Sequence, residues 1–307
     1  MGKRTNKEKG LTSAEATGIR KVLIGMKKHW QIYLLLVLPL VWYVMFAYYP
    51  MAGLQLAFKT YKVKAGIWGS PWCGLQNFEA LFRDSYFWRS VLRTLTINLG
   101  RLLFTFPAPI ILALMFNELR LGKYKKFMQT IFTFPHFLSW VIVASIMINL
   151  FSVDGLINNI ITALGGPSVN VLGSESAFQP MLYITDIWKS AGYSSIIYLS
   201  AISGIDQDQY EAAEVDGASR WQRLIHVTLP NILPTVSIMF ILTCGNLMTA
   251  GFDQIFNMQN AATKNVAEVL DMYIYRVTFQ GSVDFGFSTA VALFRSVLNM
   301  VLLVVAN

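Results

Sequence analysis

Six long runs of apolar residues limit what this 307-residue chain can fold into. A hydrocarbon core of roughly 30 Å is crossed by about 20 helical residues that rise roughly 1.5 Å each, and every run approaches that length. The runs cover residues 32–49, 94–116, 128–150, 181–202, 232–250 and 287–306. A segment in lipid must satisfy its own backbone hydrogen bonds, and these runs lack the alternation of barrel strands. We therefore predict an all-α polytopic membrane protein with six transmembrane helices.

Basic residues predict the orientation of these helices, because Lys and Arg in short loops are retained on the cytoplasmic side. The N-terminal tail and the loops after the second and fourth runs hold fourteen, whereas the other loops hold eight. We therefore expect both termini in the cytoplasm, with a basic tail over residues 1–30 and a transmembrane domain over residues 31–307. The first run is longer than the apolar part of a signal peptide, so we expect an uncleaved helix. No Lys or Arg follows the last run, and a truncated C-terminus stays an open interpretation.

Composition and motifs exclude several functional classes. The net charge of +8 comes mostly from the tail and residues 120–126, where the orientation of the helices explains it without nucleic-acid binding. The two cysteines and three histidines are too scattered for a disulfide, a metal site or a catalytic triad. The phosphate-binding pattern G-x-x-x-x-G-K-[ST] is absent from the sequence. We therefore predict a transport subunit that is not an enzyme, with no catalytic residue, metal ligand or cofactor of its own.

The loop at residues 204–230 is polar although it lies between two strongly apolar runs. Asp206 is a candidate N-cap for a short helix, and Gly217 is suited to end that helix in the left-handed conformation. Ser219 and Gln222 have the spacing of a second capping box, and Pro230 marks the entry to the fifth run. The pattern predicts two short helices joined at a glycine. Such a compact unit, with small residues and a charged rim, has the form of a plug that fits into a partner protein.

The same loop resembles the EAA loop of bacterial ABC importer permeases. That pattern is E-A-A, three residues, G, nine residues, then I-x-L-P, and here only Val227 replaces the isoleucine. The matching positions are Glu211, Ala212, Ala213, Gly217, Leu229 and Pro230. The segments "GIWGSPWCGLQNFEALF", "FPHFLSWVIV" and "EVLDMYIYR" are similar to carbohydrate permeases of the maltose-transporter type, close to the subgroup for oligosaccharides and polysaccharides.

This resemblance implies a type I importer in the bacterial cytoplasmic membrane. It implies a second permease subunit, a dimer of ATP-binding subunits that hold ATP and Mg, and an extracytoplasmic solute-binding protein. The loop would be the coupling helix: Glu211 would form an ion pair with an ATPase subunit, Gly217 would act as a joint, and Ala212 and Ala213 would permit close packing. The alternative is a secondary transporter or channel that works without ATP, which gives no reason for the spacing at 211–230.

Polar and aromatic residues inside the runs are candidates for the substrate pathway, because polar groups in a membrane are costly. We select Trp188, Tyr193, Asn246, Asp253 and Arg295, although each has a rival explanation as an interhelical contact. Arg295 lies near the middle of the sixth run and must face protein or water. Pairing with Asp186 or Asp253 is the favoured interpretation for Arg295, and lining a cavity is the alternative.

Overall fold

The computed structural model describes residues 25–119, 122–280 and 284–307. Most of the predicted basic tail, residues 1–24, lies outside the described residues, as does Arg120 of the second predicted inner loop. The chain divides into two compact units, residues 1–55 and 56–307, which we describe separately.

The first unit contains one long helical stretch. Helix α2 covers Trp30–Tyr43, continues into one π-helical turn, η1, at Val44–Tyr48, and is followed by η2 at Tyr49–Phe58. The residues of α2 are apolar on every side, which is the composition expected of a helix surrounded by lipid. The stretch Trp30–Phe58 is long and apolar enough to cross a membrane, in agreement with the first predicted run.

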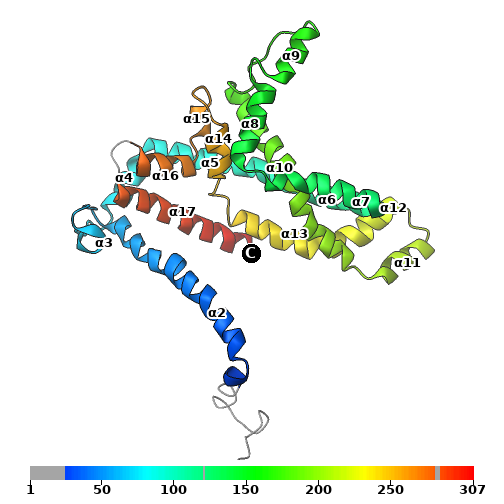
Figure 1. Ribbon diagram of the computed structural model, residues 1–307, viewed down its shortest axis with the longest axis horizontal. Helices are drawn as coiled ribbons and strands as arrows, with labels where there is room; N and C mark the ends of the chain where they lie inside the picture. The colour runs from blue at the N-terminus through cyan, green and yellow to red at the C-terminus, as the bar shows by residue number, and fades with distance from the viewer. Residues whose placement is uncertain (1–24, 120–121, 281–283) are drawn as a thin grey trace, which may run out of the picture. The chain divides into compact units, whose positions relative to one another are not determined.

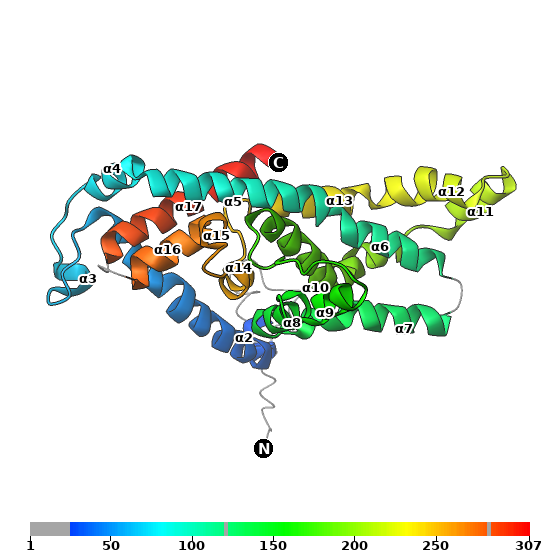
Figure 2. The same cartoon turned by 90° about the horizontal axis from the view of Figure 1, so that it is seen from above.

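The described part of the second unit is built of helices that can be followed in Figure 1. They are α3 Gly66–Gly69, α4 Gln76–Arg83, α5 Ser85–Phe104, α6 Pro107–Glu118, α7 Gly122–Thr133, η3 Phe134–Phe137, α8 Trp140–Phe151, α9 Leu156–Ala163, α10 Glu175–Ser203, α11 Gln207–Val215, α12 Arg220–Arg223, η4 Leu224–Thr228, α13 Leu229–Cys244, α14 Phe252–Met258, α15 Lys264–Ala267, α16 Leu270–Phe279 and α17 Phe285–Ala306. Figure 2 shows the same unit from above, with α11 and α12 at one end and α4 and α16 toward the other.

Five stretches among the described residues are long and apolar enough to span a membrane. They are Trp30–Phe58, Ser85–Glu118, Trp140–Ala163, Arg220–Cys244 and Phe285–Ala306. The fourth predicted run lies in α10, which at 29 residues is about 43 Å long but is less apolar, since it contains Asp186 and Lys189. Helix α10 packs against α5, α6, α7 and α13 and buries ten of its residues. Protein rather than lipid surrounds much of it, so its sequence does not need the hydropathy of a lipid-facing helix.

The third predicted run, 128–150, is wrong as one continuous helix. Helix α7 ends at Thr133, the 3-10 turn η3 contains Pro135, and α8 begins only at Trp140. Proline has no N–H to donate and disfavours helical backbone at the residue before it, so the helix stops there. Ser139 then caps α8 by accepting a hydrogen bond from Ile142 N. The last turn of α7 is pressed against α10 at Gly192, where a Cβ atom would lie 2.0 Å from Phe132 O.

The fifth predicted run, 232–250, is also too long, because α13 ends at Cys244 and helical structure resumes only at α14. Residues 245–251 between the two helices are not helical, and we call them the unwound segment. Gly251 at its end has a φ of +77°, in the left-handed region that favours glycine.

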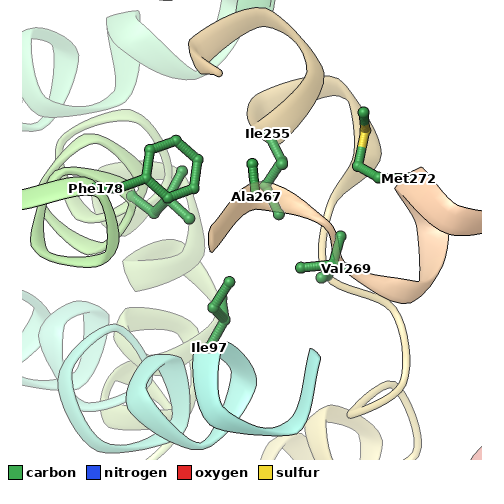
Figure 3. Packing of buried hydrophobic residues seen from close by; sticks show 8 residues of the cluster. Ile97, Phe178, Ile255, Ala267, Val269 and Met272 are labelled. Atoms are coloured by element: carbon green, nitrogen blue, oxygen red, sulfur yellow. The ribbon is translucent and has the colours of Figure 1, made fainter. Parts of the chain in front are cut away.

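The core next to the unwound segment joins five helices of the second unit. Ile97 of α5, Phe178 and Leu182 of α10, and Ile255 of α14 pack with Ala250, Ala267, Val269 and Met272 (Figure 3). Close packing of such side chains stabilises helix contacts within a membrane protein through many small van der Waals contacts. This cluster therefore ties α14, α15 and α16 to the long helices α5 and α10.

Candidate functional site

The loop between α10 and α13 has the local structure that its sequence predicts. Asp206 caps α11 by accepting a hydrogen bond from Asp208 N. Gly217 adopts a φ of +78°, which ends the first helix, and Ser219 and Gln222 form a complete capping box at α12. Each device satisfies backbone groups that a helix terminus otherwise leaves without a partner. The predicted arrangement of helix, glycine and helix is confirmed.

Three side-chain contacts hold this loop together. Glu214 Oε2 accepts a hydrogen bond from Arg223 Nη1 at 2.7 Å, which links α11 to α12. Tyr210 Oη and Thr228 Oγ1 are 2.9 Å apart. Asn231 Nδ2 donates to Gln209 Oε1 at 2.8 Å and thereby connects α11 to the first turns of α13. Helices α12, η4 and α13 follow one another without a break, so the second half of the loop and α13 form one continuous helical stretch, Arg220–Cys244.

The predicted loop residues are open to a partner. Glu211, Ala212 and Gly217 are exposed, Ala213 is half-buried, and Leu229 and Pro230 are exposed at the start of α13. Two apolar side chains add to this surface, with Val215 88% exposed and Trp221 68% exposed. Where the loop meets the ends of α6 and α10, it also borders a cavity of about 390 Å³. The loop thus presents small, acidic and apolar side chains on a stiff support.

A buried polar network surrounds the unwound segment. Asn98 Nδ2 of α5 donates to Leu247 O at 2.6 Å and to Thr249 O at 3.3 Å. From α17, Asn299 Oδ1 accepts a hydrogen bond from Met248 N at 2.9 Å. Side chains of other helices therefore replace the helical hydrogen bonds that this backbone does not make, as non-helical backbone at membrane depth requires.

Arg101 extends the network from α5 to α10. Its Nη1 donates to Ala250 O at 2.5 Å and its Nη2 to Gln254 Oε1 at 2.6 Å. Gln254 Nε2 in turn donates to Leu182 O of α10 at 2.8 Å. The Nε of Arg101 lies 3.9 Å from Asp186 Oδ2, so the charge of Arg101 has an acidic neighbour within the protein.

Arg295 pairs with Asp271, and the prediction that its partner is Asp186 or Asp253 is wrong. Asp271 of α16 accepts a hydrogen bond from Arg295 Nη1 through Oδ1 and another from Ala250 N at 2.8 Å through Oδ2. The Asp271 side chain is only 8% exposed, so it and Arg295 compensate each other where water is scarce. Arg295 therefore helps to position Asp271, which in turn holds Ala250 of the unwound segment.

The other predicted pathway residues lie at two separate places. Asn246 is exposed within the unwound segment and Asp253 is exposed at the start of α14, and Thr249 and Gly251 between them are exposed as well. Trp188 and Tyr193 are exposed on α10, and the ring of Tyr193 stacks on His136 of η3 with centroids 3.9 Å apart. Among the described residues, no ring contact, hydrogen bond or ion pair joins these two aromatic residues to Asn246, Asp253 or Arg295.

Sequence reasoning missed Asp271, Gln254 and Asn299. Asp271 and Gln254 lie between the last two apolar runs, in α16 and α14, and Asn299 is the single amide in the last run. A weak signal existed for Asp271, because Arg295 needed an acidic partner and only a few carboxylates lie near the runs. Among the residues that the structure describes, no group of three His, Cys, Asp or Glu side chains is placed to hold a metal ion.

Comparison with known proteins places these features in a family. The model of the family described as "Binding-protein-dependent transport system inner membrane component" matches residues 105–307. The chain is 41% identical to protein LplB of Bacillus subtilis over 93% of this chain and 90% of that protein. It is 39% identical to the polygalacturonan/rhamnogalacturonan transport system permease YteP of the same organism, over 94% of this chain and 90% of YteP.

A solved structure has a similar fold. The crystal structure of a bacterial ABC transporter involved in the import of the acidic polysaccharide alginate contains a chain that superposes with a TM-score of 0.84. The two chains are 38% identical, and the match covers 94% of this chain and 97% of the other. A second crystal structure, of a bacterial alginate ABC transporter in complex with an alginate pentasaccharide-bound periplasmic protein, matches with a TM-score of 0.83 at 38% identity. That match covers 92% of this chain and 94% of the other.

Proposed function

We propose, since this chain belongs to the family of inner membrane components of binding-protein-dependent transport systems, that it forms half of the translocation pathway of an ATP-dependent importer. As a member of this family it is a multi-pass protein of the inner membrane. Oligosaccharides or polysaccharides are the proposed cargo, in line with the permease for polygalacturonan and rhamnogalacturonan and the importer of alginate that it is similar to.

The proposed topology has six spans, with both termini in the cytoplasm. Helix α10 is the sixth span in addition to the five apolar stretches, because its 29 residues exceed the length needed and its polar side chains face other helices. The distribution of basic residues supports this orientation. In this proposed orientation, the loop at 204–230 lies in the cytoplasm and α14 to α16 lie on the outer side.

The proposed mechanism is mechanical transmission through the loop. An ATP-binding subunit, which holds ATP and Mg, receives α11, with Glu211 as an ion-pair partner and Ala212 and Ala213 at the closest approach. Closure of the ATPase dimer then moves α11, and Leu229 and Pro230 pass the movement to α13. Only a difference in contact between the two states of the importer can shift its equilibrium in this way.

The proposed pathway follows the exposed polar side of the unwound segment. Asn246 and Asp253 contact the saccharide. The stretch between them is held in place by hydrogen bonds with Asn98 and Asp271, and Asp271 is paired with Arg295. Trp188 and Tyr193 offer aromatic faces along α10. The remaining partners of the proposed assembly are a second permease subunit and an extracytoplasmic solute-binding protein.

The observation that carries this proposal is the exposed, internally braced loop whose last helix continues into α13. Affinity purification of the tagged chain from its native membranes in mild detergent, followed by mass spectrometry, tests the assembly. A second permease, an ATP-hydrolysing subunit and a sugar-binding protein are expected in the eluate. A stable chain recovered alone would contradict the proposal.

Gly217→Pro tests the loop itself. Proline requires a φ near −65°, whereas Gly217 has +78° and donates its N–H to Glu214 O at 3.0 Å. We expect loss of saccharide uptake with normal membrane insertion. Gly165→Pro is the matched control and should leave uptake unchanged, because Gly165 has a φ of +83° and donates to Thr162 O at 3.0 Å but follows α9, outside the loop at 204–230. Normal uptake by the Gly217 variant would remove the loop from the mechanism.

A further inference from the structure

A separate pocket of about 310 Å³ lies among α14, α15 and α16. In both views these helices lie away from α11 and α12, so the proposed topology puts the pocket on the outer side of the membrane (Figure 1). The side chains that bear on its chemistry are Phe256, Gln259, Lys264, Glu268, Tyr275 and Arg276. Neither the loop nor the polar network around the unwound segment uses this pocket.

Aromatic rings form one wall of the pocket. The rings of Phe256 and Tyr275 meet edge to face with centroids 5.3 Å apart, and Phe252 stacks on Phe256 at 5.1 Å. Phe256 is 39% exposed, and Phe279, which contacts Tyr275, is 66% exposed. Helices α14 and α16 belong to none of the apolar stretches that are long enough to span a membrane. An exposed aromatic wall beside polar groups is typical of a ligand site.

Two cationic side chains and one carboxylate line the same pocket. Arg276 uses its Nε in the ion pair with Glu268 Oε1, at 2.7 Å, and its guanidinium lies 5.2 Å above the ring of Tyr273. Its Nη1 and Nη2 donate to no side chain within the described part of the chain, and they remain available to a ligand. Lys264 is exposed at the rim. A guanidinium held this way binds a planar carboxylate with little loss of rotational freedom.

The support of Arg276 is itself fixed. Tyr273 is 1% exposed and donates its hydroxyl hydrogen to Asp84 Oδ2 at 2.6 Å. Burial, together with this hydrogen bond and the negative charge of Asp84, raises the pKa of the Tyr273 hydroxyl, so the hydroxyl keeps the proton that it donates to Asp84. The cation is therefore positioned before any ligand arrives.

We propose that this pocket is an outer subsite for an acidic saccharide. The apolar face of a sugar ring packs on Phe256 and Tyr275, its carboxylate binds Lys264 and Arg276, and its hydroxyl groups bond to the amide of Gln259. The inference rests on the proposed function, because it assumes that a saccharide arrives on the outer side. It adds a place where a uronate residue is held before it reaches the unwound segment.

Direct binding to the assembled importer tests the subsite. The importer, purified through a tag on this chain and placed in lipid nanodiscs, is titrated with trigalacturonate and with neutral maltotriose, and saturation-transfer NMR reports contact. We expect trigalacturonate to bind more tightly than maltotriose. Lys264→Gln should weaken trigalacturonate about tenfold, which is about 1.4 kcal/mol, because glutamine keeps a hydrogen-bond donor but loses the positive charge that pairs with the carboxylate. Phe256→Ala should weaken both sugars, because it removes the stacking surface.

Lys64→Gln is the matched control, because Lys64 is an exposed lysine in the first outer loop of the proposed topology, and it should leave binding unchanged. Wild-type binding by both the Lys264 and the Phe256 variant, in an importer that still takes up saccharides, would overturn the subsite and leave the proposed function intact. The subsite would also be overturned, with the proposed function intact, if the variants bound saccharides normally and only failed to bind the solute-binding protein. An importer that neither binds nor takes up saccharides would overturn both.

Discussion

The loop at 204–230 and the unwound segment at 245–251 flank the same helix, α13, yet they are stabilised in opposite ways. The loop relies on neighbours close in sequence, such as Glu214 with Arg223, nine positions apart. The unwound segment relies on Asn98, which is 149 positions from Leu247, and on Asp271 and Asn299 from other helices. The segment before α13 is thus stabilised by its own residues, and the segment after α13 is held by side chains of α5, α16 and α17.

This difference suits the loop to move and the unwound segment to stay in place. A loop that keeps its own shape can move as one body when a partner pulls on it, because few of its contacts need to break. A non-helical stretch held by several distant side chains cannot move without breaking those bonds. Substitutions in the loop should therefore reduce transport more than stability, and substitutions around the unwound segment should do the reverse.

The largest loss of stability is expected for Asp271→Ala. This change leaves the Arg295 guanidinium without its carboxylate and Ala250 N–H without its acceptor. Removal of one partner of a buried ion pair costs about 3–5 kcal/mol. Thermal unfolding of the purified protein in detergent, followed by loss of monodisperse protein, measures the effect.

A double variant checks that the lost charge pairing is the cause. Asp271→Ala combined with Arg295→Met removes both charges and should recover a large part of the stability lost in the single variant. If the double variant is as unstable as the single one, the hydrogen bond to Ala250 rather than the ion pair is the main contribution of Asp271.

A smaller loss is expected for Asn98→Ala. Two backbone carbonyls, Leu247 O and Thr249 O, lose their donor, and buried groups left without a partner cost about 1–3 kcal/mol. Asn149→Ala removes an exposed asparagine from α8 and is the matched control, with a change near zero. Equal melting temperatures for the two variants would show that the unwound segment does not depend on Asn98.

The smallest change in stability is expected for Glu214→Gln in the loop. Its side chain is 71% exposed, and ion pairs of this kind contribute about 0.2–1 kcal/mol. Uptake should nevertheless fall, because the link between α11 and α12 is weakened. If Glu214→Gln lost several kcal/mol of stability but transported normally, the loop would serve stability rather than transport, which is the opposite of what we expect.

Sequence reasoning predicted the loop well because its determinants are local. Asp206, Gly217 and Ser219 act on backbone groups within three residues of themselves, and the spacing of those residues is visible in the chain. The first, second and last apolar runs were found for a similar reason, since length and hydropathy are properties of one segment.

The interruptions within the helices were not predicted. Apolar residues flank Pro135, so the run continues in sequence although the helix ends at Thr133. Helix α13 ends at Cys244, and the non-helical backbone after it is held by Asn98, Asp271 and Asn299. These three residues are distant in sequence, so no local pattern predicts their contacts. The partner of Arg295 was missed for the same reason, because Asp271 lies in a segment between two runs rather than inside one.

Helix α10 has a consequence for the biosynthesis of the protein. Asp186 and Lys189 make it a poor substrate for insertion into bare lipid, where a charged residue at the helix centre costs about 2.5–3.5 kcal/mol. Two of its packing partners, α5 and α6, leave the ribosome earlier, and α5 carries Arg101, the ionic neighbour of Asp186. In the proposed topology, the order of synthesis therefore provides a protein surface before the least apolar span needs one, and α10 inserts next to helices that are already in the membrane.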